Sequence, residues 1–155
     1  MARRKTLRIF IFDDDPSITK LLQLVLSSQG HHVQTFQNPI YCHIYQNNQC
    51  QCPQEFPCAD VIISDIMMPH MNGIDLLRLQ RDKGCKAPAE NKALMSAKTN
   101  TTQKEAVEEL GCHFIKKPFH LDDICEWIEA CSERLPQERQ LAQLKKTYKA
   151  DHIGC

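Results

Sequence analysis

Five short apolar runs recur along the chain and predict β-strands. They are LRIFIF at 7–12, HHVQTF at 31–36, ADVIISD at 59–65, KALMS at 92–96 and CHFIKK at 112–117. Runs of this length that are rich in Ile, Val and Phe, with apolar residues on both faces, are typical of buried parallel strands. HHVQTF alternates between apolar and polar residues, so we expect it at or near an edge of the sheet.

The stretches between these runs predict helices, because their apolar residues recur three and four positions apart. Asp15 and Pro16 form an N-cap and a first helical proline, and Gly30 ends the helix that they begin. Thr101 or Thr102 is expected to cap a later helix. The remaining predictions are a short helix at 39–45, a loop at 46–58, a helix that begins at Ile74, a helix at 101–110 and a helix at 122–131.

Alternation of strands and helices predicts an α/β domain with a parallel sheet. The predicted elements end near residue 133, so we expect one domain over 1–133. In the remaining residues, 134–155, the segment QERQLAQLKKTYK after Pro136 has only Leu141 and Leu144 as apolar anchors. They are expected to form a helical or partly ordered extension, and no output domain is expected.

Charge and hydropathy exclude several classes of protein. The 155 residues contain 19 Lys and Arg against 19 Asp and Glu, so no broad charged surface for nucleic acid or anionic lipid is expected. No apolar stretch approaches 18 residues, and the apolar run near the N-terminus is too short for a signal peptide. We therefore expect a cytoplasmic protein that does not bind membranes.

Polar side chains that are suited to binding or catalysis follow the predicted strands. Asp13, Asp14 and Asp15 follow the first, Asp65 ends the third, Ser96 ends the fourth and Lys117 follows the fifth. The carboxyl ends of parallel strands meet at one edge of a sheet, where ligands bind. Carboxylates there can hold Mg²⁺ or Mn²⁺, while a hydroxyl and an ammonium suit a phosphoryl group. The pattern therefore predicts a phosphoryl site.

Four motifs resemble the receiver domain of response regulators in two-component signalling. They are FDDDP, IISDIMMPHMNGIDLL, MSA and FIKKPF, in the family's order over about residues 6–133. The resemblance implies a flavodoxin-like, doubly wound sheet of strand order 2-1-3-4-5 with helices on both faces. It also implies that Pro118 follows a cis peptide bond.

The resemblance also assigns roles to residues. Asp65 would accept a phosphoryl group from a histidine kinase or a phosphotransfer protein, aided by Ser96 and Lys117. Asp14, Asp65 and the backbone carbonyl of Met67 would ligate Mg²⁺, and Asp13 would act through water. Ser96 and Phe114 would form the switch.

The same resemblance predicts a signalling role without enzymatic turnover beyond autodephosphorylation. Output would come through protein–protein contact at the face of the fourth helix, fifth strand and fifth helix, or through a phosphorelay. A single-domain regulator without direct nucleic-acid contact is expected, and a homodimer remains possible.

Nine cysteines leave a second hypothesis open, that of a metal- or redox-responsive adaptor that uses the loop from Cys42 to Cys58. The intervals between Cys42, Cys50, Cys52 and Cys58 are seven, one and five residues, unlike the paired spacing of zinc sites. The other cysteines within the predicted domain, Cys85, Cys112, Cys125 and Cys131, are expected to be core or boundary residues.

A third hypothesis is a small phosphatase of the haloacid-dehalogenase type. Asp13 and Asp15 imitate that family's Asp-x-Asp motif, and Asp122 and Asp123 imitate its late acid pair. This alternative leaves Asp65 without a role.

Overall fold

The computed structural model describes residues 5–39, 42, 52 and 54–144, and its centre is a sheet of five parallel strands. The strand order is β2-β1-β3-β4-β5. The predicted fold is therefore confirmed, including the edge position of the second strand. The strands are β1 (Arg8–Phe12), β2 (His32–Phe36), β3 (Val61–Asp65), β4 (Lys92–Ser96) and β5 (His113–Lys116).

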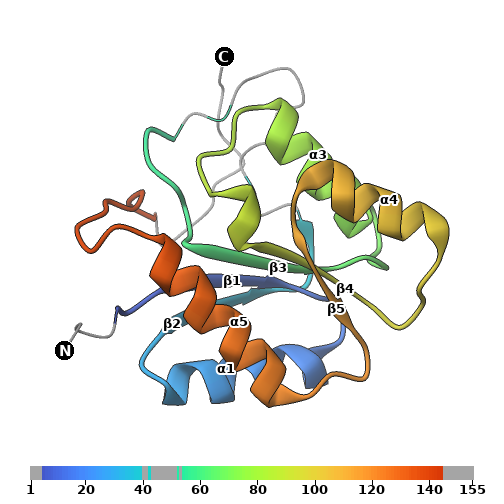
Figure 1. The fold of residues 1–155 in the computed structure, drawn as a ribbon, viewed down its shortest axis with the longest axis horizontal. Coiled ribbons are helices and arrows are strands. Elements are labelled where there is room, and N and C mark those ends of the chain that lie inside the picture. The colour runs from blue at the N-terminus through green and yellow to red at the C-terminus, as the bar shows by residue number, and fades with distance from the viewer. Residues whose placement is uncertain (1–4, 40–41, 43–51, 53, 145–155) are drawn as a thin grey trace.

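Helices cover both faces of the sheet (Figure 1). On one face lie α1 (Pro16–Ser28) and α5 (Leu121–Arg134), and on the other lie α3 (Gly73–Asp82) and α4 (Thr101–Leu110). A short 3₁₀ helix, η2 (Ala89–Asn91), precedes β4. Within the described part of the chain, no helix combines the length and apolar character needed to cross a membrane. The helix predicted at 39–45 lies mostly outside the described residues.

Each face of the sheet has its own apolar core, as expected for strands buried on both sides. Leu22 and Leu26 of α1 pack with Ile128 of α5 in the first core. Leu76 and Leu77 of α3 pack with α4 in the second core. The central strands supply side chains to both cores, which fixes the positions of the strand ends.

Two N-caps set where helices begin. Asp15 Oδ1 accepts a hydrogen bond from the Ser17 amide at 2.9 Å, as predicted for α1. For α4 the prediction was wrong, because Asn100 is the cap and its Oδ1 accepts from the Gln103 amide at 2.8 Å. Thr101 is already the first helical residue, so its hydroxyl is not in the capping position.

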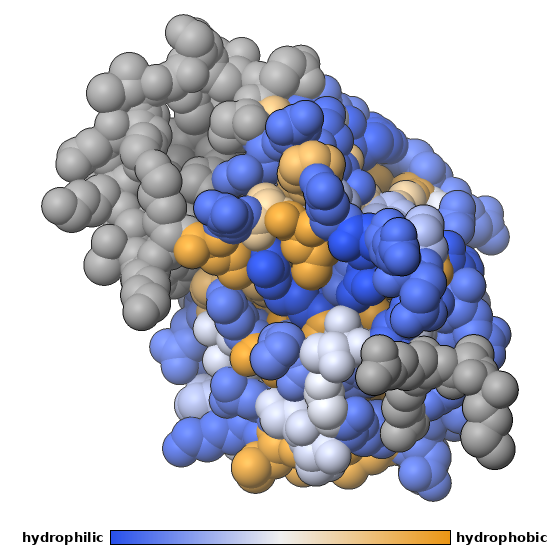
Figure 2. Space-filling view, turned by 90° about the vertical axis from the view of Figure 1, so that its left-hand side faces the viewer, coloured by the Kyte–Doolittle hydropathy of each residue, from blue (hydrophilic) through white to orange (hydrophobic). Residues whose placement is uncertain are grey.

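Residues 135–144, here called the C-terminal strap, cross the end of the sheet where the strands begin, without forming a helix. Arg139 binds both carboxylate oxygens of buried Asp60, with Nε–Oδ1 at 2.5 Å and Nη2–Oδ2 at 2.6 Å. The amide of Ala142 donates to the Pro57 carbonyl at 2.8 Å. Figure 2 views this end of the molecule, where hydrophilic residues are interspersed with hydrophobic ones.

A hollow of about 500 Å³ lies between the edge strand β5 and α5. Phe114, Phe119 and Trp127 line it together with charged residues of both elements. The ring of His113 stacks on Trp127, with ring centroids 4.9 Å apart and planes within 10° of parallel. This surface therefore offers aromatic side chains next to charged ones.

Candidate functional site

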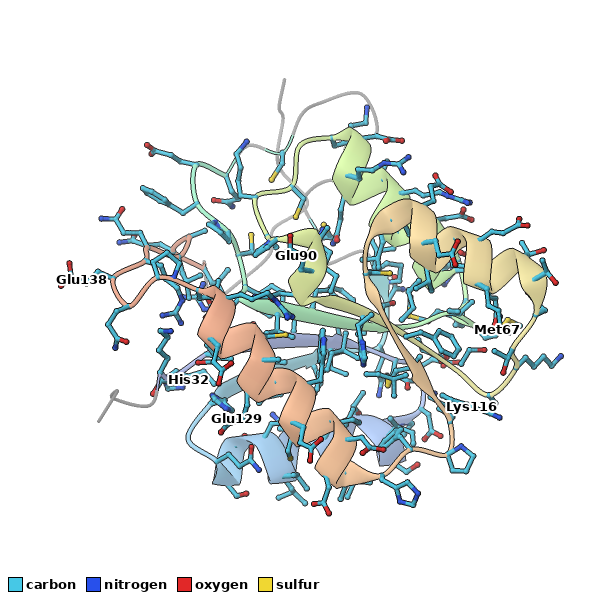
Figure 3. All side chains as sticks on the ribbon, viewed as in Figure 1. His32, Met67, Glu90, Lys116, Glu129 and Glu138 are labelled. Atoms are coloured by element: carbon cyan, nitrogen blue, oxygen red, sulfur yellow. The ribbon has the colours of Figure 1, made fainter. Side chains whose placement is uncertain are left out.

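Three aspartates meet at the carboxyl end of the sheet. Asp13 and Asp14 follow β1, and Asp65 is the last residue of the neighbouring strand β3. Each supplies a carboxylate oxygen, and these oxygens all lie within 4.8 Å of one another. Asp13 and Asp65 are buried while Asp14 is exposed, so the cluster opens to solvent on one side. Figure 3 shows Met67 and Lys116 at this same end, opposite His32 and Glu138.

Lys117 supplies the positive charge of this cluster. Its Nζ lies 3.0 Å from Asp13 Oδ2 and 3.0 Å from Asp65 Oδ1. The lysine follows β5, and its amide donates to the Ser96 carbonyl at 2.9 Å, which anchors it beside β4. The peptide bond between Lys117 and Pro118 is cis, as the resemblance implied. The ammonium offsets the repulsion between two buried carboxylates.

Burial and neighbouring charges shift both pKa values. Burial raises the pKa of the Asp65 carboxyl above its ordinary value of 3.8, the Lys117 hydrogen bond opposes this, and Asp13 adds to the rise. Burial alone would lower the pKa of Lys117, but its hydrogen bonds to Asp13 and Asp65 outweigh burial and raise the pKa. The lysine is therefore held charged next to a carboxylate that is partly desolvated.

Ser96 ends β4, next to Asp65, and only 2% of the residue is exposed. Its Oγ accepts a hydrogen bond from the Lys98 amide at 3.1 Å and one from Gln103 Nε2 at 3.4 Å. A hydroxyl oxygen has two lone pairs and one hydrogen. Because both lone pairs have donors, the hydrogen of Ser96 is the part left to donate. The second amide atom of Gln103, its buried Oε1, has no hydrogen-bond partner among the described residues.

Gly73 brings the start of α3 against the acceptor strand. Its amide donates to the Ile66 carbonyl at 2.9 Å, and a Cβ at this position would lie 2.3 Å from the backbone oxygen of Asp65. Only glycine fits without movement of Asp65. The hydrophobic pattern predicted a helix that begins at Ile74 and gave Gly73 no role, since a close approach between two backbones leaves no mark on hydrophobic periodicity.

The structure brings together part of the predicted site. Asp13, Asp14, Asp65 and Lys117 converge, with Ser96 at the adjoining strand end. Met67 is 65% exposed and lines an open depression of about 610 Å³ together with Asp14.

Phe114 is partly buried against the second core, two residues before the end of β5. Its side chain therefore packs on the face of the sheet that α3 and α4 cover.

Of the four acids that the phosphatase hypothesis needs, only Asp13 belongs to the cluster. Asp15 caps α1, while Asp122 and Asp123 form the first turn of α5. Among the described residues, the group with metal-ligand spacing contains Asp13, Asp14 and Asp65 instead. The donor arrangement of a haloacid dehalogenase is therefore not formed by these residues.

Comparison with known proteins gives a family match over most of the chain. The family model of the response regulator receiver domain matches residues 9–129. The chain is also similar to the DNA-binding response regulator MtrA of Mycolicibacterium smegmatis, with 29% identity over 133 residues. That match covers 84% of this chain and 53% of MtrA. The chain thus spans about half the length of this curated relative.

Solved structures share the fold. The receiver domain of the Francisella response regulator 1452 superposes with a TM-score of 0.67 at 22% identity, covering 83% of this chain and 98% of that one. The crystal structure of FixJ-N gives a TM-score of 0.65 at 24% identity, covering 86% and 99%. Both similarities support the doubly wound architecture.

Proposed function

The chain belongs to the response regulator receiver domain family, and on this premise we propose that Asp65 accepts a phosphoryl group from the phosphohistidine of a histidine kinase or phosphotransfer protein. The observation that carries the proposal is the convergence at Asp65. Its carboxylate lies 3.0 Å from the Lys117 ammonium and within 4.8 Å of the ligand oxygens of Asp13 and Asp14.

The proposed step needs positioning and charge compensation more than acid–base chemistry. An oxygen of Asp65 attacks phosphorus, the P–N bond to the donor imidazole breaks, and the leaving imidazole takes up a proton. Lys117 lies where its charge can pair with the phosphoryl oxygens. Ser96 can donate its free hydroxyl hydrogen to the same group.

The donor set fits a hard divalent cation. Three carboxylates, one of them exposed, suit Mg²⁺, which prefers oxygen ligands and keeps several waters. We propose that Asp14, Asp65 and the Met67 carbonyl hold Mg²⁺ or Mn²⁺, with Asp13 acting through water. When bound, the ion would neutralise charge that develops on the transferred phosphoryl group.

We propose that output uses the face formed by α4, β5 and α5. Phe114 lines the hollow between β5 and α5, so a change in its packing would alter the shape of this surface. The proposed partners are proteins, either a downstream target, the next member of a phosphorelay or a second copy of the chain. MtrA, of which this chain spans about half, is named as DNA-binding. For this chain we propose no direct nucleic-acid contact and a cytoplasmic setting.

The test is covalent modification. The full chain is incubated with acetyl phosphate and Mg²⁺, and its intact mass is measured beside an Asp65→Asn variant and an EDTA control. We expect one added phosphoryl group that requires both Asp65 and the cation. Asp15→Asn is the matched control, because Asp15 caps α1 and lies outside the cluster.

Two results would contradict the proposal. The first is the absence of an adduct together with the absence of beryllofluoride binding. The second is an adduct that persists in Asp65→Asn. Steady turnover of p-nitrophenyl phosphate that disappears in Asp13→Asn would favour a phosphatase instead of an acceptor.

A further inference from the structure

Cysteines from separate parts of the sequence meet at the C-terminal end of α3. The amide of Cys52 donates to the Lys83 carbonyl at 2.7 Å, and the amide of Cys85 donates to the Gln80 carbonyl at 2.8 Å. Gln80 Nε2 in turn donates to the sulfur of Cys42 at 3.7 Å. Cys42, Cys52 and Cys85 therefore all contact the same turn of the chain, residues 80–83.

Cys58 belongs to the same group. It packs against the second core, as do Cys42 and Cys85. Burial first, and then the neighbouring thiols of Cys42, Cys52 and Cys85, raise the pKa of the Cys58 thiol to about 12. With the Cys52 amide bonded to Lys83, the four cysteines therefore border the region between the second core and the C-terminal end of α3.

Two buried polar side chains, Gln80 and Lys92, form a chain of hydrogen bonds that leads to this region from inside the protein. Gln80 is 2% exposed and Lys92 is 5% exposed. Lys92 Nζ donates to Gln80 Oε1 at 2.9 Å, which turns the amide nitrogen of Gln80 toward the sulfur of Cys42. Among the described residues, no carboxylate lies within ion-pair distance of Lys92. A buried cation and an N–H donor aimed at sulfur are the surroundings that stabilise thiolate ligands.

We propose that Cys42, Cys52, Cys58 and Cys85 together bind one Zn²⁺ ion, in a structural site that fastens the segment between β2 and β3 to α3. Four cysteine sulfurs form a closed tetrahedral site, which suits zinc and leaves no open position for substrate. Binding releases four protons, because each thiol becomes a thiolate. The resulting negative charge would be offset by the ammonium of Lys92.

The proposed Mg²⁺ and Zn²⁺ sites differ in the chemistry of their ligands, so each site would select its own cation. The aspartates offer hard oxygen ligands at the carboxyl end, whereas the thiols offer soft ligands on the α3 side. Among the described residues, only the three aspartates bring ligand atoms within 4.8 Å of one another. Zinc binding must therefore draw the four sulfurs closer together.

The experiment uses the full chain, purified under reducing conditions without added chelator. Its zinc content is measured by mass spectrometry of the metal, and the apoprotein is titrated with Co²⁺. We expect one equivalent of zinc and, with Co²⁺, thiolate charge-transfer and visible bands typical of tetrahedral sulfur coordination. No stoichiometric zinc and no such bands would overturn the proposal.

Single substitutions decide which cysteines are ligands. Cys85→Ser is the most decisive test. Cys85 follows α3 and lies 27 residues beyond Cys58 in sequence, outside the loop that carries the other three cysteines. It should lower zinc affinity at least tenfold, as should Cys58→Ser. Cys125→Ser, on the opposite face of the sheet, should leave affinity unchanged. Binding that survives Cys85→Ser with full affinity would overturn this ligand set in favour of one within the loop alone.

Further control measurements separate a loss of zinc binding from a loss of folding. Circular dichroism of each apo variant shows whether it is folded, and Gln80→Leu gives a variant that keeps all four thiols but loses the donor to Cys42. It should weaken zinc binding without abolishing it, and unchanged affinity would count against the proposed surroundings of the site. The Asp65→Asn protein should bind zinc normally, so failure of the phosphoryl-acceptor proposal would leave this test intact.

Discussion

Lys117 pairs one ammonium with two carboxylates, and this explains how three consecutive acids can follow an apolar strand. Asp13 has no exposed surface, and its Oδ2 shares the ammonium with Asp65. Asp14 is exposed, so water hydrates its charge, and Asp15 caps the start of α1. Position relative to the strand ends predicted that acids of two strands would converge, and the resemblance to receiver domains singled out Asp13, Asp14 and Asp65. It could not predict that Gln103, seven residues beyond Ser96, would hold the serine hydroxyl.

Replacing Lys117 by Met should destabilise the protein by about 3 kcal/mol at neutral pH, because two carboxylates would lose their shared cation. The pKa of Asp65 is already raised, and without the lysine it should rise further. A carboxyl whose pKa is higher in the folded than in the unfolded state destabilises the fold as pH rises between the two values. The deficit should therefore grow from acidic to neutral pH.

Urea unfolding at several pH values, with and without Mg²⁺, measures this effect. Mg²⁺ should restore more stability to Lys117→Met than to the wild type, since the ion replaces the missing charge. Lys116→Met is the control, because Lys116 is the residue next to Lys117 and is exposed to solvent. Equal losses for the two variants would show that the shared ion pair has no special role.

At the level of elements, hydrophobic periodicity predicted the strands and helices because each buries a regular stripe or a continuous run. Close approaches between elements have no such periodic signal. Gly73 of α3 approaches the backbone of Asp65 closely, and Cys85 packs against the same core as Cys42 and Cys58, which precede β3. Both contacts join parts of the chain that only the finished fold brings together. For this reason the sequence analysis gave Gly73 no role, whereas its prediction of Cys85 as a core or boundary residue is confirmed.

Gly73→Ala should displace α3 or the end of β3, at a cost of about 2 kcal/mol, because the new methyl group would overlap the Asp65 carbonyl. The rate of modification by acetyl phosphate should fall with it. Gly30→Ala is the matched control. It has a φ of +93° but open space around a new Cβ, so it should cost about 1 kcal/mol of stability and leave the modification rate unchanged. A normal rate in Gly73→Ala would show that Asp65 tolerates the shift.

At the scale of the whole molecule, the C-terminal strap crosses the end of the sheet where the strands begin. The sequence did not predict this strap. We expected a helical or partly ordered extension over 134–155. Its described residues beyond α5, 135–144, form no helix and run as a strap with Arg139 on buried Asp60. Arg8 reinforces it by donating to the carbonyls of Cys58 and Ala142. A single arginine in a polar tail gives no signal of a partner 79 residues away, since ion pairing follows tertiary geometry.

Arg139→Ala should cost about 3–5 kcal/mol, because it leaves the Asp60 carboxylate buried without its cation. Thermal or urea unfolding measures the loss. Arg139→Lys should restore only part of it, since lysine lacks the planar fork that binds both oxygens. In the double variant Asp60→Asn/Arg139→Ala the two losses should not add. Additive losses would mean that the two residues act independently.

The stacked rings of His113 and Trp127 give the molecule an intrinsic optical probe. Trp127 is the only tryptophan in the chain, and it lies on the surface proposed for output. Burial and the charge of Arg134 lower the pKa of His113 below its ordinary value of 6.5. A protonated imidazole quenches indole emission, so fluorescence should fall only in clearly acidic solution, and His113→Gln should abolish that step. At neutral pH the emission would then report on the output surface itself, without an attached dye.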